Sequence, residues 1–480
     1  MTDQPIRIPV LRAGKPYESL EQNEVKDLRT GAVLAVVDQA NAGIVRRDLK
    51  KQDEHFAALR AIPIAERLRI CKRAGELFLR GRLPVGPGCE QGPDEYVQTL
   101  SRTSGLSHAM VRANMAKVHT VLDGMDVILR GLTRAMDLSV LDGGFGAQHG
   151  VPLGFFPTTR SLGIVLPSNS PGVNSIWIPS LALGVPVVLK PGREEPWTPL
   201  RIVQALIAAG MPAQAFSFYP TNHEGSAAIL ELCGRSLLFG DVAVTQAYAR
   251  DPRVQIHGPG RSKVVIGEDA IDAWPDYLDL LVDSIAKNGG RSCVNASAIL
   301  VPRHAEALAD ALAQRLAAIE PLPPEDPRAT LSAFANPRFA ESIDAGIEGA
   351  LKQPGAVEVT AKHRKGARHV VVEGAHYLRP TLVRCQSLQH PLANTEYLFP
   401  YASVVELPSS RWLEEMGPSL VVTAITRDKS LQRSIIESPL VERLNLGPAP
   451  TTRVDWDQPH EGNLFEFLYA RRAIHAEAGW

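Results

Sequence analysis

The chain has 480 residues, enough for about three structural units with large apolar cores. Hydrophobic residues make up 45% and charged residues 21%, which excludes disordered and collagen-like chains. The 51 Lys and Arg nearly balance the 52 Asp and Glu, so the net charge does not indicate binding to nucleic acid or to an anionic membrane. Chemistry on a small molecule is therefore favoured.

The N-terminus, Met1–Pro5, lacks the basic stretch and apolar run of a secretion signal, and no run of about 18 apolar residues spans a bilayer. We therefore expect a cytoplasmic protein that binds neither nucleic acid nor membrane. The first 130 or so residues are predicted to be mostly helical, with amphipathic helices within 57–80 and a turn-rich loop at Leu83–Cys89. A further helix is expected over 107–135.

Residues 136–159 include a glycine-rich stretch and are predicted to be extended chain joining two units. From Ser161, short apolar strands alternate with helices. The expected strands are 162–166, 185–190, 216–219, 236–239 and 254–257, and the expected helices are 171–183, 198–209, 224–233 and 242–250. This pattern predicts a doubly wound parallel sheet, which binds ligands at the carboxyl ends of its strands.

A second α/β unit is predicted from Gly258 onward. Its expected strands are 263–267 and 298–302, and its expected helices are 274–287 and 305–319. Prolines make 321–327 a loop, and 462–474 has a β-like pattern.

The five cysteines, Cys71, Cys89, Cys233, Cys293 and Cys385, include no CxxC pair, so neither a disulfide framework nor a metal site is expected. Cys293 ends the segment Asn288-Gly-Gly-Arg-Ser-Cys293, between a predicted helix and strand. Glycines beside a thiol let a ligand approach, and nearby backbone N–H groups lower a thiol pKa, which favours a nucleophile. A small core residue is the structural alternative.

Two strand ends carry polar groups. Pro167-Ser-Asn169-Ser-Pro-Gly172 places an amide where it can donate to an oxyanion, although Asn beside Pro and Gly also suits a plain turn. Lys190-Pro-Gly-Arg193-Glu194-Glu195 places a cation and two carboxylates where a nucleotide binds, unless the segment is only a solvated loop.

Taken in order along most of the chain, these segments resemble the aldehyde dehydrogenase superfamily. Leu166-Pro-Ser-Asn169-Ser-Pro resembles Pro-Trp-Asn-x-Pro, and Asn288-Gly-Gly-Arg-Ser-Cys293 resembles Asn-x-Gly-Gln-x-Cys. Further matches are Val188-Leu-Lys190-Pro, Lys263 to Ala270, Tyr377-Leu-Arg-Pro-Thr-Leu382 and Glu396-Tyr-Leu-Phe-Pro400. The resemblance implies that Cys293 attacks an aldehyde, that the Asn169 amide holds the oxyanion, and that a thioester remains on Cys293.

The resemblance also implies a nicotinamide dinucleotide, NAD or NADP. Lys190 would hold the adenosine ribose and Glu396 the nicotinamide ribose. The residues it assigns to the cofactor are Pro167, Lys190, Arg193, Glu194, Gly240, Glu396 and Phe399.

The chain departs from the family pattern at the residue that acts as general base. Hydrolytic members carry a glutamate that activates water against the thioester, and His257 occupies that place in Ile256-His257-Gly258-Pro259. Imidazole accepts protons near neutral pH, so His257 is a candidate general base. One alternative is transfer of the acyl group to coenzyme A, which needs no strong base, or the reverse reaction, reduction of an acyl-CoA to an aldehyde. His257 can also be a locally hydrogen-bonded strand-end residue, and the chain can be a catalytically idle family member.

Two further departures concern the cofactor. The family's glycine-rich phosphate turn is reduced to Phe239-Gly240-Asp241-Val242, with an acid where phosphate is expected. Arg193 falls where NAD-preferring members carry Glu, but Glu194 is adjacent, so NAD and NADP both stay open.

The predicted fold is therefore α/β and aldehyde dehydrogenase-like. A doubly wound cofactor domain spans 1–135 and 160–257, and a catalytic domain spans 258–445. The segments 136–159 and 446–480 resemble a small β extension for oligomerisation, which implies a homodimer or homotetramer. The sequence does not identify the aldehyde, and Trp177 is a candidate for a wall of its tunnel or for the core.

Overall fold

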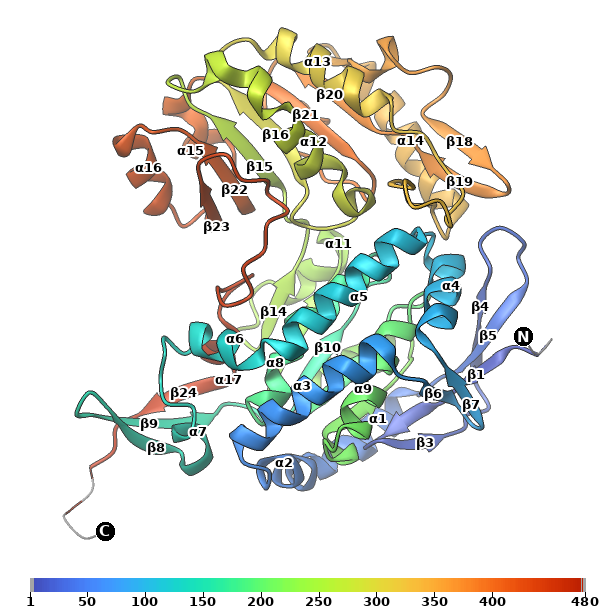
Figure 1. The fold of residues 1–480 in the computed structure, drawn as a ribbon, viewed down its shortest axis with the longest axis vertical. Helices are drawn as coiled ribbons and strands as arrows, with labels where there is room; N and C mark the ends of the chain where they lie inside the picture. The colour runs from blue at the N-terminus through green and yellow to red at the C-terminus, as the bar shows by residue number, and fades with distance from the viewer. Residues whose placement is uncertain (1–3, 476, 478–480) are drawn as a thin grey trace.

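A computed structural model describes residues 4–475 and residue 477, and two large sheets dominate it (Figure 1). The first is a seven-stranded sheet of order β14-β13-β10-β11-β12-β2-β3. Its strands are β2 (Val10–Arg12), β3 (Lys15–Tyr17), β10 (Leu162–Val165), β11 (Val187–Lys190), β12 (Phe216–Phe218), β13 (Arg235–Phe239) and β14 (Val254–His257). β10 to β14 run parallel and are mostly apolar, as expected of strands covered on both faces.

Helices pack around this first sheet. They are α1 (Ala42–Asp48), α2 (Gln52–Arg60), α3 (Ile64–Arg80), α4 (Pro93–Ser104), α5 (His108–Asp123), α6 (Met125–Leu132), α8 (Pro179–Ala182), α9 (Trp197–Ala208), α10 (His223–Leu232) and α11 (Val242–Thr245). α3, α5 and α9 lie side by side over it (Figure 1). One large apolar core joins these helices to the strands.

The second sheet also has seven strands, in the order β17-β20-β21-β16-β15-β22-β23. They are β15 (Ser262–Ile266), β16 (Ala296–Val301), β17 (Ala356–Glu358), β20 (Thr381–Cys385), β21 (Tyr401–Glu406), β22 (Ser419–Ile425) and β23 (Val441–Leu446). Two apolar clusters fill the space between this sheet and its helices. These helices are α12 (Leu278–Ala286), α13 (Ala305–Ala317), α14 (Pro337–Leu351), α15 (Trp412–Glu415) and α16 (Lys429–Ile436).

The remaining strands form small sheets. They are β1 (Ile6–Ile8), β4 (Gln22–Lys26) and β5 (Val33–Asp38) in one sheet, the pairs β6 (Leu83–Gly86) with β7 (Cys89–Gln91) and β18 (His369–Val372) with β19 (Ala375–Leu378), and β8 (Phe145–Gln148) with β9 (Val151–Pro157) and β24 (Tyr469–Arg472). The short helix α7 (Val140–Gly143) precedes β8, and α17 (Leu464–Leu468) precedes β24.

The chain leaves the second sheet at β23 and returns to the first half through residues 447–463 (Figure 1). Asn463 then donates from Nδ2 to the carbonyl oxygen of Leu132 at 2.9 Å, and Tyr469 pairs with Pro157 in the β24–β9 ladder. This crossing segment, residues 447–463, therefore runs between the two halves of the molecule and is fixed at its far end.

The predicted α/β class and the order of strands from 162 to 302 are confirmed. The first 130 residues are mostly helical, as predicted, but residues 6–38 form strands that complete the first sheet and a small neighbouring one. The predicted loop at Leu83–Cys89 is part of the β6–β7 hairpin. Within the predicted helix 171–183, a 3₁₀ turn at Pro171–Ile176 precedes the four-residue α8, since Pro179 lacks the N–H of a continuous helix.

Three further boundaries differ. The predicted helix 242–250 is only α11 followed by a 3₁₀ turn. The predicted helix from 274 begins as a 3₁₀ turn that contains Pro275. The β-like segment 462–474 contains α17, started by Asn463 as N-cap, before β24. Across residues 4–475, the described helices include none long and apolar enough to cross a bilayer.

Candidate active site

Cys293 lies in a tight loop between α12 and β16. Asn288, Gly289 and Gly290 all adopt left-handed backbone, with φ of 55°, 65° and 68°. At Gly290 an added Cβ would lie 2.4 Å from the carbonyl carbon of Phe399, so only glycine fits there. The buried Arg291 anchors the loop by donating from Nη1 to the Ser104 carbonyl at 2.8 Å.

Residues 260–262, at the start of β15, contact the backbone of Cys293. The Ser262 hydroxyl donates to the Cys293 carbonyl at 2.8 Å. A Cβ on Gly260 would lie 2.1 Å from that same carbonyl oxygen. The Cys293 backbone is thus clamped between its own loop and residues 260–262.

Burial raises the pKa of the Cys293 thiol, and the charges of Glu461 and Glu396 raise it further. The Lys117 ammonium and a backbone hydrogen bond act in the opposite direction but are weaker. The expectation of a lowered thiol pKa is therefore wrong, because burial and the two carboxylates outweigh Lys117 and the backbone hydrogen bond. Ionising Cys293 requires a base.

Asn169 lies against the cysteine loop. Its Nδ2 donates to the Arg291 carbonyl at 3.0 Å, two residues before Cys293. Asn288 Nδ2 reaches Ser170 Oγ at 3.2 Å. The amide predicted for the oxyanion thus lies beside the predicted nucleophile.

His257, the last residue of β14, is buried and has a partner that the sequence analysis missed. Its Nδ1 donates to the carboxylate of Glu461, in the crossing segment. Its ring stacks on Phe239, with centroids 4.4 Å apart and planes 16° apart. The buried Nε2 has no partner among the described residues. This arrangement implies the tautomer with the proton on Nδ1 and a free acceptor on Nε2.

The backbone of Glu461 is fixed beside the strand that carries His257. Gln255, which lies two residues before His257 on β14, donates from Nε2 to the Glu461 backbone carbonyl. Burial acts to raise the pKa of Glu461, but its hydrogen bond and its other interactions with His257, together with His460, outweigh burial and lower the pKa. The carboxylate is therefore ionised near neutral pH.

One cavity of about 540 Å³ joins these groups. The predicted site residues that line it are Pro167, Asn169, Glu194, Gly240, His257, Cys293 and Glu396, and Glu461 lines it as well. Its walls are the segments that follow β10, β13 and β14, the cysteine loop, α14 and the loop that precedes β21. The cavity therefore lies where a doubly wound sheet binds ligands.

Three predicted cofactor residues are not part of that lining. Lys190 ends β11, and burial lowers its pKa while the Glu194 charge opposes the shift. Arg193 is exposed, and Phe399 is buried beside Tyr397 and Tyr401. Trp177 is fully buried, with its indole N–H bonded to Asn174 Oδ1 at 3.0 Å, so it packs in the core.

Glu396 faces the cavity from the second half. Its carboxylate accepts the Arg261 backbone N–H at 2.8 Å. Burial raises its pKa to about 7, because two backbone hydrogen bonds compensate only in part and the Glu461 charge adds to the rise.

The turn Phe239–Val242, which takes the place of the family's phosphate-binding turn, also differs from that turn in its hydrogen bonds. Asp241 caps α11, and its carboxylate accepts the Val244 N–H at 3.0 Å. The amides that would meet a pyrophosphate already have an anionic partner there.

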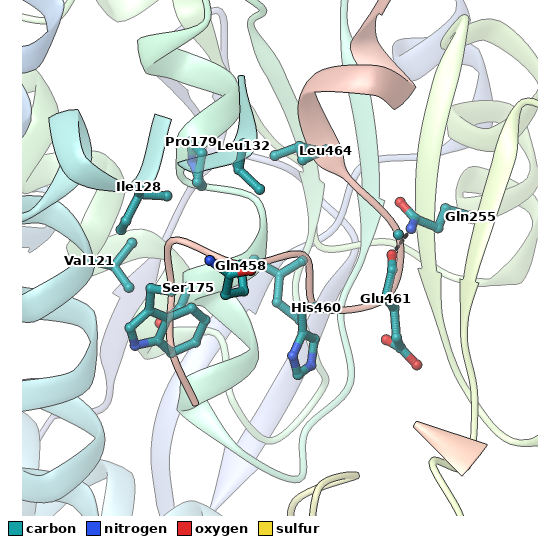
Figure 2. A pocket seen from close by; sticks show the side chains of 13 residues that line it. Val121, Ile128, Leu132, Ser175, Pro179, Gln255, Gln458, His460, Glu461 and Leu464 are labelled. Atoms are coloured by element: carbon teal, nitrogen blue, oxygen red, sulfur yellow. Dashed lines mark hydrogen bonds between the residues drawn. The ribbon is translucent and has the colours of Figure 1, made fainter. Parts of the chain in front are cut away.

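A smaller pocket of about 40 Å³ lies on the other side of the crossing segment (Figure 2). Figure 2 shows Val121, Ile128 and Leu132 from α5 and α6 on one side, with His460 and Glu461 on the other. Glu461 lines both pockets, so the two adjoin at this residue.

A sequence model described as the aldehyde dehydrogenase family matches residues 16–411. The chain belongs to the aldehyde dehydrogenase family. The superfamily resemblance inferred from the motifs is confirmed.

Curated relatives are similar over part of the chain. An aminoacetaldehyde dehydrogenase from Pseudomonas aeruginosa is 29% identical over 51% of this chain and 49% of its own. A 5-carboxymethyl-2-hydroxymuconate semialdehyde dehydrogenase from Escherichia coli is 22% identical over 78% of each. In the first relatives the match spans only 49% and 60% of those proteins.

Solved structures match the fold more completely. An indole-3-acetaldehyde dehydrogenase in complex with NAD+ superposes with a TM-score of 0.80, at 17% identity, over 98% of this chain and 96% of its own. At this identity the match establishes the aldehyde dehydrogenase fold.

Proposed function

We propose that the chain oxidises an aldehyde to a carboxylic acid, with NAD or NADP as electron acceptor, through a thioester on Cys293. The observation that carries the proposal is the convergence of Cys293, Asn169 and His257 on one cavity. These residues come from three separate segments of a family member. Relatives named for the oxidation of aldehydes support the same reaction class.

In the first step, Cys293 gives its proton to His257 Nε2, and the thiolate attacks the carbonyl carbon. Burial of the thiol makes this acceptor necessary. Asn169 Nδ2 has two hydrogens and uses one on the Arg291 carbonyl, so the other is available for the oxyanion. Collapse of the adduct, with loss of the aldehyde hydrogen and its electron pair, leaves a thioester on Cys293.

A nicotinamide dinucleotide, when bound, supplies the acceptor for that electron pair. The cavity suits its ribose ends, since Glu194 and Glu396 present carboxylates to hydroxyl groups and Pro167 and Gly240 follow strand ends. The turn at Asp241 does not suit its phosphates. NAD and NADP have to be compared directly.

In the last step, water releases the acid. His257 first releases the Cys293 proton to solvent, then takes a proton from water at Nε2 while Glu461 stabilises the imidazolium across Nδ1. The hydroxide adds to the thioester carbon, and the Cys293–carbon bond breaks to give the acid and the thiolate. The His257–Glu461 pair would thus replace the single glutamate of hydrolytic family members.

The test follows nicotinamide absorbance with a panel of aldehydes, with NAD or NADP, and with or without coenzyme A. Turnover to free acid without coenzyme A, abolished in Cys293→Ser, is the expected result. Turnover that requires coenzyme A and yields an acyl thioester overturns the hydrolytic step. Absence of any turnover that depends on Cys293 makes this an idle family member.

We also propose a homo-oligomer built on the small sheet β24-β9-β8 and a cytoplasmic location. β8 is an edge strand of this sheet, and Phe145 and Val151 expose 55% and 52% of their surface beside it. Cys71, Cys233 and Cys385 are buried free thiols, which suits a reducing compartment. Light scattering of the purified chain tests the assembly, and a monomer at micromolar concentration would exclude it.

A further inference from the structure

Asn114 is a polar side chain in the buried face of α5. Met110 and Val118, on the same face, are apolar, and Asn114 exposes only 2% of its surface. Burying an amide costs free energy unless its polar atoms are hydrogen-bonded. The partners of Asn114 therefore indicate what this side chain does.

The amide of Asn114 is held in one of its two orientations. Its Nδ2 donates to the Met110 carbonyl, one turn earlier in α5, at 2.9 Å. It also donates to Asn288 Oδ1, in the cysteine loop of residues 288–293, at 2.9 Å. A flipped amide would turn its oxygen towards the Met110 carbonyl, and two acceptors cannot bond to each other. Asn114 therefore presents a donor to Asn288.

This donor fixes the amide of Asn288 in turn. Because Asn288 Oδ1 faces Asn114, its Nδ2 is directed to the serines on the other side. It donates to Ser170 Oγ and to Ser292 Oγ, each at 3.2 Å. The hydrogen bonds thus run in one direction, from α5 through the Asn288 amide to two serine hydroxyl groups.

The two serines are the chain neighbours of the reacting groups. Ser170 follows Asn169, whose amide is proposed to bind the oxyanion, and Ser292 precedes Cys293. A turn of the amide that bridges the serines would therefore shift the oxyanion donor relative to the nucleophile. A displacement of about 1 Å in a reacting group costs about 100-fold in rate.

The oxygen of the Asn114 amide gains nothing from this arrangement. It is buried and has no hydrogen-bond partner within the described part of the chain, which costs stability. A Cβ on Gly172 would lie 2.8 Å from this oxygen, so the glycine permits the approach. An apolar side chain on α5 would avoid the cost. We therefore attribute the asparagine to the hydrogen bond that it donates to Asn288.

We propose that Asn114 is a positioning residue for the oxidation of the aldehyde, and that it acts through Asn288 to hold Asn169 and Cys293 at a fixed spacing. The proposal rests on the proposed function, because it assigns a further residue to the same site. Asn169 and Cys293 line the cavity of about 540 Å³, whereas Asn114 does not. Asn114 therefore acts on the reaction only through other residues.

The first test substitutes Asn114 by Leu, which has a similar size and no donor. We expect kcat to fall about 10- to 100-fold, as for a small displacement of reacting groups, with KM for the aldehyde nearly unchanged. Thr120→Val is the matched control. The Thr120 hydroxyl also donates to a carbonyl one turn earlier in α5, that of Ala116 at 2.9 Å, but Thr120 is exposed. A normal kcat in Asn114→Leu, or an equal loss in Thr120→Val, would overturn the proposal.

The second test separates positioning from a general loosening of α5. Asn288→Gly removes the amide through which Asn114 acts. Adding Asn114→Leu to Asn288→Gly should reduce kcat by less than about twofold further, because residues of one hydrogen-bond chain do not contribute independently. Losses that multiply would give Asn114 an effect independent of Asn288, which contradicts the proposal.

The third test needs no turnover, so it applies even if the chain has no aldehyde activity. Hydrogen exchange measured by mass spectrometry reports local opening of the peptide that contains residues 288–295. Exchange there should be faster in Asn114→Leu than in the wild type and unchanged in Thr120→Val, with exchange of α13 equal in all three proteins. Equal exchange of this peptide in the wild type and Asn114→Leu would overturn the proposal. A wild type without turnover would overturn the proposed function alone.

Discussion

His257 Nδ1 donates a hydrogen bond to the carboxylate of Glu461, which lies 204 residues further along the chain. The two residues come from the last strand of one sheet and from the segment that crosses between the halves. With Phe239 stacked on the ring, the pair fixes one tautomer and one orientation of the imidazole. The unpartnered Nε2 of His257 is thereby held in one orientation.

Substituting His257 by Gln should slow both the formation of the thioester and its hydrolysis, because the proposed mechanism uses His257 as the base in both steps. Loss of a general base reduces a proton-transfer step about 10²- to 10⁴-fold. Steady-state turnover should fall by at least that range, and the first turnover, followed as nicotinamide absorbance, should slow with it. Glu461→Gln keeps an acceptor for Nδ1 and should cost less than His257→Gln. A rapid first turnover that persists in His257→Gln, with acylated Cys293 found by mass spectrometry, would place His257 only in the hydrolytic step.

Gly260→Ala should inactivate the site by displacing Cys293. The added Cβ would meet the Cys293 carbonyl oxygen at 2.1 Å, and backbone cannot move aside as a side chain does. We expect kcat/KM to fall at least about 100-fold, as for a misplaced reacting group. Gly349→Ala on α14 is the control, because no atom lies within 4 Å of its added Cβ. Full activity in Gly260→Ala would show that the clamp on Cys293 is unimportant.

Asn288 combines left-handed backbone with side-chain bonds, and two substitutions separate these roles. Its amide contacts Asn114 at 2.9 Å and Ser170 and Ser292 at 3.2 Å. Asn288→Gly keeps the backbone but loses the bonds, whereas Asn288→Ala loses both. Activity should fall in both variants, and thermal unfolding should show Asn288→Ala about 1 kcal/mol less stable than Asn288→Gly, the cost of a Cβ in this conformation. Equal stabilities would exclude backbone strain at this position.

Glu195 should make stability depend on pH. Its buried carboxyl group caps α9, accepting the Thr198 N–H at 2.8 Å and the Thr198 hydroxyl at 2.6 Å, and burial raises its pKa from 4.5 to about 8. The folded state therefore keeps a proton that the unfolded state releases. Stability from this group is complete below pH 4.5 and is lost as the pH rises through about 8.

Denaturant unfolding of wild type and Glu195→Gln across this window checks the sign. The free energy of unfolding of the wild type should fall relative to the variant by up to about 1.4 kcal/mol per pH unit. Parallel pH profiles of the two proteins would contradict the raised pKa.

The local pattern of apolar residues was sufficient to predict much of the fold. The apolar runs at 162–166 and 254–257 predicted parallel strands whose ends, Pro167 and His257, meet at one cavity. The N-terminal strands were missed because segments such as Lys15–Tyr17 are too short and polar to alternate clearly, and only pairing with a neighbouring strand makes them β.

The site was predictable where a motif is contiguous, as at Asn288 to Cys293. Glu461 was not, since nothing near His460 in the sequence indicates that the segment crosses to β14. Asn114 was equally hidden, because an isolated asparagine in a predicted helix does not indicate a contact with the cysteine loop. The raised thiol pKa depends on burial by residues from both halves, which no local pattern reports.

The crossing segment also sets an order in time. A ribosome makes Cys293 and His257 long before it makes Glu461, and the anchor at Asn463 and Tyr469 comes later still. A partly synthesised chain can thus fold both sheets and still lack the partner that orients its base. Reactivity toward aldehydes would therefore begin only when the last part of the site has been translated.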